Sequence, residues 1–205
     1  MEARFESPFE DLDAAQAALW QRLVRAARDR RSAWHNPVVA SVGLDGAPRA
    51  RVMVLRHADR ATGRLRLHTD IRTSKVAELA REPRVALLFY DAPARLQLRL
   101  EGLARIESQG EAADLAWAAS RPFSRRCYTA PAAPGTPADG PTSGLPPDLE
   151  QREPTLAESE AGRPHFAVML VDARSLEFLH LAVTGHRRGR FCRDGDAWLG
   201  SWLIP

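Results

Sequence analysis

The stretch VALLFYDAPARLQLRLEG, residues 85–102, decides the fold class of this chain. Val85–Tyr90 is a continuous apolar run, which is typical of a buried strand. Arg95–Glu101 then alternates strictly, so its three leucines share one face and its polar side chains share the other. The two runs predict neighbouring strands of an antiparallel sheet with one face turned toward the core.

Further strand patterns flank this stretch on both sides. Val38–Val42 and Ala50–Arg56 are joined by an Asp45-Gly46 hairpin signal, and a second turn, Asp59–Gly63, precedes an alternating run. The pattern returns near the C-terminus in the runs Phe166–Val171, Ser175–Leu181, Arg190–Cys192 and Ala197–Trp202. Hairpin-linked strands of this kind predict a mostly β, antiparallel, Greek-key-like barrel with flanking helices rather than a doubly wound sheet.

Helices are expected beside the strands. Ser7–Glu10 resembles a capping box, and apolar residues recur at three- and four-residue spacing from Leu12 to Ala27 behind it. Thr73–Arg81 has helical character with Thr73 or Ser74 as its N-cap, and a third helix is expected around Glu111–Ser120.

A change of composition follows the third helix. Thr129–Arg163 holds seven of the fifteen prolines and almost no large apolar residues. Such a stretch buries little surface, so we expect a flexible linker at about 129–163. Because strand patterns resume after it, we predict a single domain over residues 1–205 that contains this linker.

Length and composition exclude several classes of protein. With 205 residues, 44% hydrophobic and 27% charged, the chain is near the globular average, which argues against disorder, collagen and coiled coil. Met1–Glu6 carries acidic residues and no apolar core, so no signal peptide is expected, and no apolar run is long enough to span a membrane. Cys127 and Cys192 are too few for a disulfide scaffold, so we expect a cytoplasmic protein.

The charge favours a small anionic ligand. The net charge is only +3 despite a pI near 9.4, because 26 acidic residues nearly balance 29 basic ones. Lys75 is the only lysine, so the other 28 basic residues (29 − 1) are arginines. No long basic tail is present, and we expect no nucleic-acid partner. The planar, forked guanidinium of arginine is suited to binding phosphate or carboxylate groups.

Familiar catalytic motifs are absent from the sequence. Its six histidines show no metal-ligand pairing, and neither a nucleophile elbow nor a Gly-rich nucleotide loop occurs. We therefore expect no metal and assign no catalytic residue.

One constellation does suit a phosphate group. Arg51 and Arg56 lie on one predicted strand, and Thr73-Ser74-Lys75 opens a predicted helix whose N–H groups and dipole favour an anion. The alternative is a pair of solvated arginines, an ordinary helix cap and a surface lysine.

Five pieces of sequence, in order and spacing from Arg51 to Ile106, resemble one family. They are RVMVLR at 51–56, HTD at 68–70, TSK at 73–75, EPRVALLF at 82–89, and LQ at 96–97 with Gly102. This set is similar to the signature of the pyridoxamine 5′-phosphate oxidase-like proteins, the FMN-binding split barrels. Arg190-Phe191 and the terminal Trp202–Pro205 resemble that family's C-terminal segment.

The resemblance implies an FMN-binding split β-barrel that forms a homodimer with two flavin sites at its interface. Arg51 and Lys75 would hold the FMN phosphate, and Arg190 of the partner subunit would reach the flavin. The flavin contacts implied by the resemblance are Arg51, Val52, Met53, Val54, Leu55, Arg56, His68, Thr69, Ser74, Lys75, Gln97 and Arg190.

The substrate half of the pattern departs from the family. The family's Tyr-x-x-x-Arg-Pro-x-x-Ser segment keeps Arg121 here, but the tyrosine is Trp117 and the serine is Arg125. A C-terminal Arg-Leu-His triplet becomes His186-Arg187-Arg188. By resemblance, the substrate contacts are Trp117, Arg121 and Arg188.

These features predict an FMN-dependent oxidoreductase that transfers a hydride between FMN and a small anionic or aromatic substrate. Oxidation of pyridoxine or pyridoxamine 5′-phosphate is one such activity, and a related reaction on another substrate is a second. The alternative is a non-catalytic split-barrel protein that binds flavin or haem, with His68 or His180 as the haem ligand.

Overall fold

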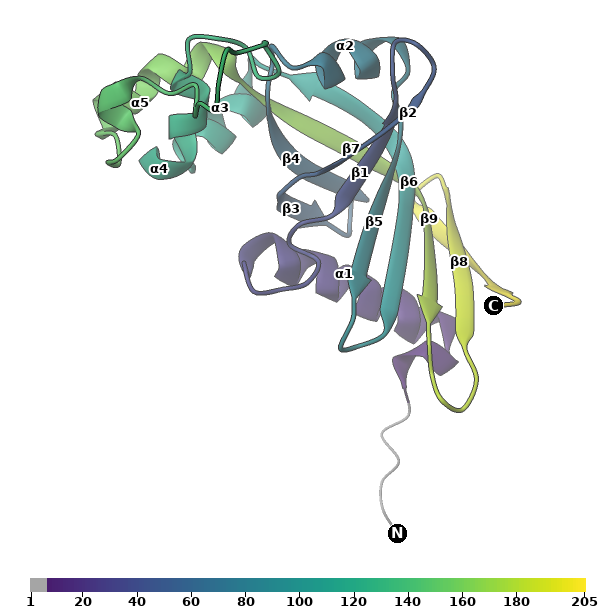
Figure 1. Ribbon diagram of the computed structural model, residues 1–205. Coiled ribbons are helices and arrows are strands. Elements are labelled where there is room, and N and C mark those ends of the chain that lie inside the picture. The colour runs from purple at the N-terminus through teal and green to yellow at the C-terminus, as the bar shows by residue number, and fades with distance from the viewer. Residues whose placement is uncertain (1–6) are drawn as a thin grey trace.

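The computed structural model describes residues 7–205 and shows a barrel of antiparallel strands flanked by helices (Figure 1). The strands are β1 (Val38–Val42), β2 (Pro48–Val52), β3 (Leu55–Asp59), β4 (Arg64–Asp70), β5 (Arg84–Asp91), β6 (Leu96–Glu107), β7 (Phe166–His180), β8 (Arg187–Asp194) and β9 (Ala197–Leu203). The α-helices are α1 (Leu12–Arg28), α2 (Ser74–Arg81), α3 (Glu111–Ala118), α4 (Pro122–Arg125) and α5 (Leu156–Ser159). The 3₁₀ helices are η1 (Pro8–Glu10), η2 (Arg126–Thr129), η3 (Pro147–Leu149) and η4 (Glu160–His165). The predicted mostly β, antiparallel fold with flanking helices is confirmed.

The strands form one sheet in the order β2-β1-β5-β6-β7-β4-β3, and β8 and β9 extend it from β7. The two halves of β7 have different neighbours. Its first half, Phe166–Asp172, pairs with β4, whereas its second half, Ser175–His180, pairs with β8. One strand thus belongs to the barrel at one end and to a separate hairpin at the other. The sequence predicted two strands here, and the structure has one strand of 15 residues.

Gly102 allows β6 to follow this long strand. The register of β6 against β7 shifts between Glu101 and Gly102, where a β-bulge lies. A Cβ atom at Gly102 would collide with the carbonyl oxygen of Asp172. Glycine at this position is therefore required by the close approach of two backbones.

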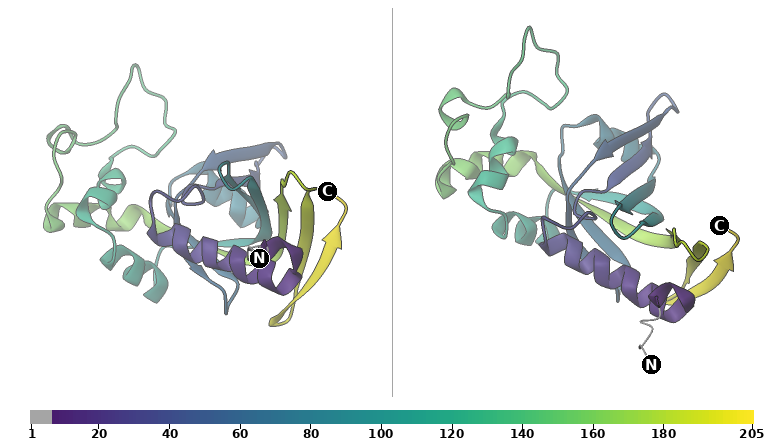
Figure 2. Two further views of the ribbon diagram at one scale, coloured as in Figure 1. Left: turned by 90° about the horizontal axis from the view of Figure 1, so that it is seen from below. Right: turned by 60° about the horizontal axis from the view of Figure 1, so that its bottom comes forward.

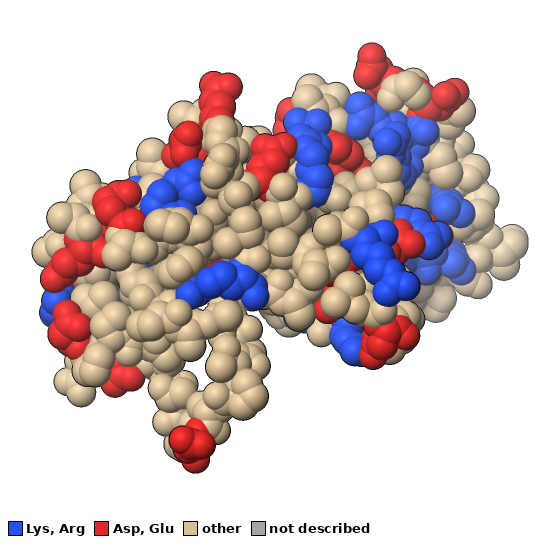
Figure 3. All heavy atoms as spheres, turned by 90° about the horizontal axis from the view of Figure 1, so that it is seen from above, with Lys and Arg blue, Asp and Glu red and all other residues tan. Residues whose placement is uncertain are grey.

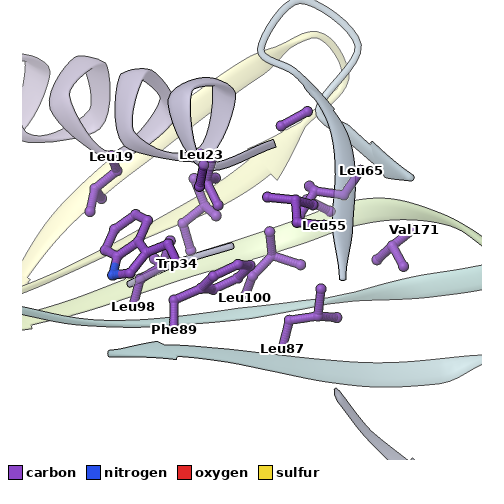
Figure 4. Packing of buried hydrophobic residues seen from close by; sticks show 14 of the residues in the cluster. Leu19, Leu23, Trp34, Leu55, Leu65, Leu87, Phe89, Leu98, Leu100 and Val171 are labelled. Atoms are coloured by element: carbon purple, nitrogen blue, oxygen red, sulfur yellow. The ribbon is translucent and has the colours of Figure 1, made fainter. Parts of the chain in front are cut away.

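Helix α1 closes the bottom of the barrel (Figure 1). Its apolar stripe reaches into the barrel, where Leu19 and Leu23 lie above the cluster that contains Trp34 and Leu55 (Figure 4). The helix begins after Asp11, whose side chain accepts from the Ala14 N–H at 2.8 Å. Ser7 instead caps the short η1. The expected capping box at Ser7–Glu10 is therefore wrong, because η1 ends in extended backbone at Asp11 before α1 starts.

A small helical unit stands beside the barrel rather than around it (Figure 2). It contains α3, α4, η2, α5 and η4, and its core is Trp117, Tyr128 and the first residues of β7, including Phe166. The segment at 129–163, which was predicted as a linker, is irregular in its first half. Its second half contains the short helices η3, α5 and η4. The guanidinium of Arg126 donates to the carbonyls of Leu149 and Glu150, which holds this part of the segment against η2.

Two predictions concern membranes and export. Within residues 7–205, the structure contains no helix that has both the length and the apolar character needed to cross a membrane. Met1–Glu6, on which the prediction about a signal peptide rested, lies outside the described residues.

Candidate functional site

Arg51 is fixed at the end of the barrel, where β2 passes under α2. Its guanidinium donates to the hydroxyl of Ser41 on β1 at 2.6 Å and to the carboxylate of Glu78 on α2 at 2.9 Å. Ser41 donates to the same Glu78 oxygen at 2.9 Å, and both side chains are buried. Neither Ser41 nor Glu78 belongs to a sequence motif, and only the folded barrel brings them to Arg51.

Lys75 lies next to Arg51 in the first turn of α2. Its Nζ donates to the hydroxyls of Thr69 at 3.1 Å and Thr73 at 3.0 Å, and it forms no ion pair within residues 7–205. Burial lowers the pKa of Lys75, and the neighbouring charge of Arg51 lowers it further. Two cations therefore lie close together at a half-buried position, where the carboxylate of Glu78 pairs with Arg51 and that of Asp70 also acts on Lys75.

The start of α2 adds donors to the same place. Thr73 is the N-cap residue, but its hydroxyl makes no capping bond and donates to the Asp70 carbonyl at 2.7 Å. The first turn of α2 contains no acidic residue, and Ser74 is exposed there. The helix terminus therefore offers backbone N–H groups and a positive dipole end. Together with Arg51, Lys75 and the hydroxyls, this donor set fits a phosphate monoester.

A rigid segment joins β2 to β3 beside Arg51. The Met53 N–H donates to the Pro37 carbonyl at 3.0 Å, and the Leu55 N–H donates to the His35 carbonyl at 2.9 Å. Met53 and Leu55 are buried, whereas Val52 is exposed and Val54 lines a hollow of about 560 Å³. This segment can border a planar ring whose phosphate tail lies at Arg51 and Lys75.

The side chains of His68 and Arg56 lie elsewhere. Adjacent residues of a strand face opposite sides, and His68 packs edge-on against Phe166 at 4.8 Å while Thr69 turns inward to Lys75. Both His68 and Arg56 line a cavity between the barrel and the helical unit. The side chain of His68 therefore faces away from Lys75.

Gln97, Arg188 and Arg190 are not brought to this site within one chain. Four strands, β1, β5, β6 and β7, separate Arg190 on β8 from Arg51 on β2. Arg188 pairs with Glu177 at 2.7 Å, and Arg190 lies 3.7 Å from Glu101.

In the 117–125 segment, the side chains of Trp117, Arg121 and Arg125 have different environments. Trp117 is buried and donates through Nε1 to Glu160 at 2.9 Å. Arg125 is also buried, and its guanidinium donates to the Trp117 carbonyl at 2.7 Å and to Glu160 at 2.6 Å. Arg121 alone is exposed and lines the cavity that contains His68 and Arg56.

Comparison with known families decides what kind of protein has this site. A family model described as pyridoxamine 5′-phosphate oxidase matches residues 17–144, more than half of the chain. The chain belongs to the pyridoxamine 5′-phosphate oxidase family. The matched range runs from α1 past β6 and includes Arg51, Thr69, Ser74 and Lys75.

Curated members of this family extend over most of the chain. A pyridoxine/pyridoxamine 5′-phosphate oxidase 2 from Arabidopsis thaliana is 25% identical over 174 residues, which is 80% of this chain and 84% of that protein. A pyridoxine/pyridoxamine 5′-phosphate oxidase from Myxococcus xanthus is 30% identical over 174 residues, covering 82% and 80% of the two chains.

Solved structures in the pyridoxamine 5′-phosphate oxidase family share the fold. A family-related FMN binding protein from Nostoc punctiforme superposes with a TM-score of 0.70 at 21% identity, covering 92% of this chain and 96% of that one. PhzG from Burkholderia lata, solved with tetrahydrophenazine-1-carboxylic acid, gives 0.67 at 19% identity, covering 99% and 98%. These likenesses confirm the split-barrel fold that the sequence predicted.

Proposed function

We propose that this chain binds FMN and acts as an FMN-dependent oxidoreductase on a small anionic or aromatic molecule. The observation that carries the proposal is the pair Arg51 and Lys75 at the uncapped start of α2. Two cations held together at a half-buried position are stabilised by a dianionic phosphate. The relatives support this assignment, since they include oxidases and an FMN binding protein.

The residues of the chain would bind and orient the cofactor. Arg51 and Lys75 would neutralise its phosphate, with Thr69 and Ser74 as further donors. The segment Val52–Leu55 would border the ring, since its backbone is fixed to Pro37 and His35. When bound, FMN supplies the acceptor or donor of the hydride, and the protein supplies position and electrostatics.

We further propose that the active form is a homodimer in the cytoplasm. Gln97 and Arg190 lie on the outer face of the sheet, far along it from Arg51, so Arg190 of the partner subunit is the one suited to complete the flavin site. Cys127 and Cys192 are both free and exposed, which suits a reducing compartment.

FMN titration of the flavin-free protein tests the site. We expect Lys75→Ala and Arg51→Ala each to remove a charge-assisted contact worth about 1.5–3 kcal/mol, which weakens FMN affinity roughly 10- to 150-fold. The quenching of flavin fluorescence on binding measures the affinity.

Arg49→Ala is the matched control. Arg49 lies two residues before Arg51 on the same strand, but it is exposed and pairs with Asp45 at 2.7 Å. Its loss should leave the FMN affinity unchanged. Wild-type affinity in both Lys75→Ala and Arg51→Ala would contradict the assignment.

A visible absorption spectrum of the purified protein separates the alternatives. Flavin bands support the proposal, whereas a Soret band identifies a haem protein. The surroundings of the two candidate haem ligands favour flavin: Arg56 and Arg66 place positive charge beside His68, and His180 packs on Phe9 at 4.8 Å. Turnover of pyridoxamine 5′-phosphate by the FMN-loaded protein would identify the substrate, and we expect little because Trp117 and Arg125 are occupied by structural contacts.

A further inference from the structure

Asp70 is a buried carboxylate beside the proposed phosphate site, and the proposed function does not use it. It is the last residue of β4, and its side chain is only 7% exposed. The hydroxyl of Thr73 connects it to Lys75, because this hydroxyl donates to the Asp70 carbonyl at 2.7 Å and accepts from Lys75 Nζ at 3.0 Å. A buried carboxylate is costly unless a cation and hydrogen bonds compensate its charge.

The charge of Asp70 acts on Lys75, but the two groups do not pair. Burial is the main cause that lowers the pKa of Lys75, and the negative charge of Asp70 acts in the opposite direction. Within residues 7–205, however, Lys75 forms no ion pair, and its ammonium donates to the hydroxyls of Thr69 and Thr73. Opposite charges attract strongly away from water, so another group must hold the carboxylate in place.

Arg72 occupies both oxygens of the Asp70 carboxylate. Its Nε donates to Oδ1 at 3.0 Å and its Nη2 donates to Oδ2 at 2.7 Å. The backbone N–H of Arg72 also donates to Oδ1, at 2.8 Å. A bidentate pair between a guanidinium and a carboxylate is among the strongest charge-assisted contacts in proteins. The negative charge of Asp70 is therefore matched inside its own turn.

The remaining nitrogen of the guanidinium fixes Arg72 to the start of the proline-rich segment. Nη1 donates to the carbonyls of Ala130 at 2.9 Å and Pro131 at 3.0 Å. All three guanidinium nitrogens are thus engaged in contacts within the chain. Arg72 therefore differs from Lys75, whose charge has no acidic partner among the described residues.

We propose that Arg72 is a positioning residue of the phosphate site, which holds Asp70 away from Lys75 and so leaves the ammonium free for a phosphate monoester. Naming FMN as that monoester rests on the proposed function, whereas the effect of Arg72 on Lys75 does not. Without Arg72, the buried carboxylate of Asp70 loses its cation and takes the ammonium of Lys75 as its partner. The phosphate then meets an occupied ammonium and an unbalanced negative charge.

The single lysine of this chain allows a direct test in the flavin-free protein. Isotope-labelled lysine gives one side-chain signal, that of Lys75, and nuclear magnetic resonance follows its titration with pH. We expect Arg72→Gln to raise the pKa of Lys75 by about 1, because a carboxylate that moves close favours the charged form. Adding Asp70→Asn should cancel this rise.

Arg84→Gln is the matched control. Arg84 binds Glu82 through the same three donors, with its backbone N–H at 3.2 Å, Nε at 2.8 Å and Nη2 at 2.7 Å. This pair lies at the other end of α2, and the side chain of Arg84 is 75% exposed. Its loss should leave the titration of Lys75 unchanged. Circular dichroism confirms that each variant is folded.

FMN titration gives a second readout of the same variants. We expect Arg72→Gln to weaken FMN affinity at least about tenfold, and Arg72→Gln/Asp70→Asn to restore it to within about threefold of wild type. A merely structural role of Arg72 predicts no such rescue. Wild-type affinity in Arg72→Gln, or a double variant as weak as the single one, overturns the proposal.

The two proposals fail separately. An unchanged pKa of Lys75 in Arg72→Gln, or a rise that persists after Asp70→Asn is added, overturns the role of Arg72 whether or not FMN binds. A wild-type protein that takes up no FMN refutes the flavin assignment. A rise in the pKa of Lys75 that Asp70→Asn cancels retains the role of Arg72 even in that case.

Discussion

Lys75 and the arginines of this protein use their positive charge differently. The ammonium of Lys75 is a compact donor that rests between two threonine hydroxyls, at 3.0 and 3.1 Å. Arg51 is a planar fork, and it bridges Ser41 and Glu78 while remaining beside Lys75. The two residue types are not interchangeable in such positions, because the planar guanidinium holds its donors at fixed angles whereas the ammonium donates from a single nitrogen.

His68 provides a prediction about acid stability. Its pKa in the folded protein is about 3, against 6.5 for an ordinary histidine. Below pH 6.5 the unfolded chain therefore takes up a proton at this residue and the folded chain does not, so stability is lost as the pH falls. Between pH 7 and pH 5 this costs up to about 2 kcal/mol. His68→Asn should remove that dependence, as urea unfolding of both proteins at the two pH values would measure.

The comparison between the two proteins isolates His68, since the other histidines contribute equally to both. The same pH dependence of unfolding in His68→Asn and wild type would show that His68 is protonated in the folded state. Its imidazole resonances would then titrate near the ordinary value, which nuclear magnetic resonance can detect.

At the scale of elements, β7 pairs with β4 along its first half and with the β8–β9 hairpin along its second half. The first half of β7 also contributes Phe166 to the core of the helical unit. Its neighbour β4 supplies Thr69 to the contact with Lys75, and it supplies His68 to the opposite face of the strand. Because successive residues of β4 face opposite sides, a single strand contributes to the proposed flavin-phosphate site and to the cavity that His68 and Arg56 line.

Arg125 holds the helical unit together, and its removal should loosen that unit alone. The buried guanidinium bonds to the Trp117 carbonyl and to Glu160. Arg125→Ala removes the charge-assisted hydrogen bonds of this buried guanidinium, which costs about 1.5–3 kcal/mol, while the Trp117 carbonyl keeps its bond from the Ser120 N–H at 2.9 Å. We expect faster amide hydrogen exchange in α3–η4 and unchanged FMN affinity.

Arg152→Ala provides the control for this prediction. Arg152 pairs with Asp148 and Glu158 on the surface of the same unit, and exposed pairs contribute little. If Arg152→Ala exposed α3–η4 to exchange as much as Arg125→Ala did, the special role of the buried guanidinium would be refuted.

At the scale of the whole molecule, apolar side chains gather on the outer face of the sheet formed by β2, β1, β5 and β6. Val52 is 65% exposed, Tyr90 is 50% exposed and Leu88 is 39% exposed. Seen from the α2 side, basic and acidic side chains lie in separate groups among larger uncharged areas, with most of the basic ones toward the right of the view (Figure 3). An exposed apolar patch of this kind is typical of a protein interface.

We propose that the homodimer forms through this patch, which gives a prediction about assembly. Leu88→Lys introduces a charge into the middle of the patch, and we expect sedimentation velocity to show a shift from dimer to monomer. The FMN affinity should fall together with the dimer, because Arg190 of the partner subunit is then lost from the site. Val183→Lys is the control, since Val183 is 92% exposed in the loop between β7 and β8.

A Leu88→Lys protein that sediments as wild type would refute the interface. A monomeric variant with unchanged FMN affinity would keep the interface and contradict the contribution of Arg190.

Local sequence patterns alone determined much of the secondary structure of this protein. Alternation at Arg95–Glu101 and the Asp45-Gly46 turn predicted strands and a hairpin that the structure has, because period and turn chemistry act over a few residues. The motifs at 51–56 and 73–75 likewise marked Arg51 and Lys75, which lie together in the structure. The capping box at Ser7 failed because Asp11 is an equally local and better placed cap.

Only the tertiary structure decided which side chains face one another across the barrel. Ser41 and Glu78 are 37 residues apart, and the pairing of β1 with β2 under α2 brings both to Arg51. The cavity around Arg66 and His68 likewise needs α1, β4 and the helical unit together. Spacing along the chain carries no record of such contacts, because they depend on how sheet and helices pack.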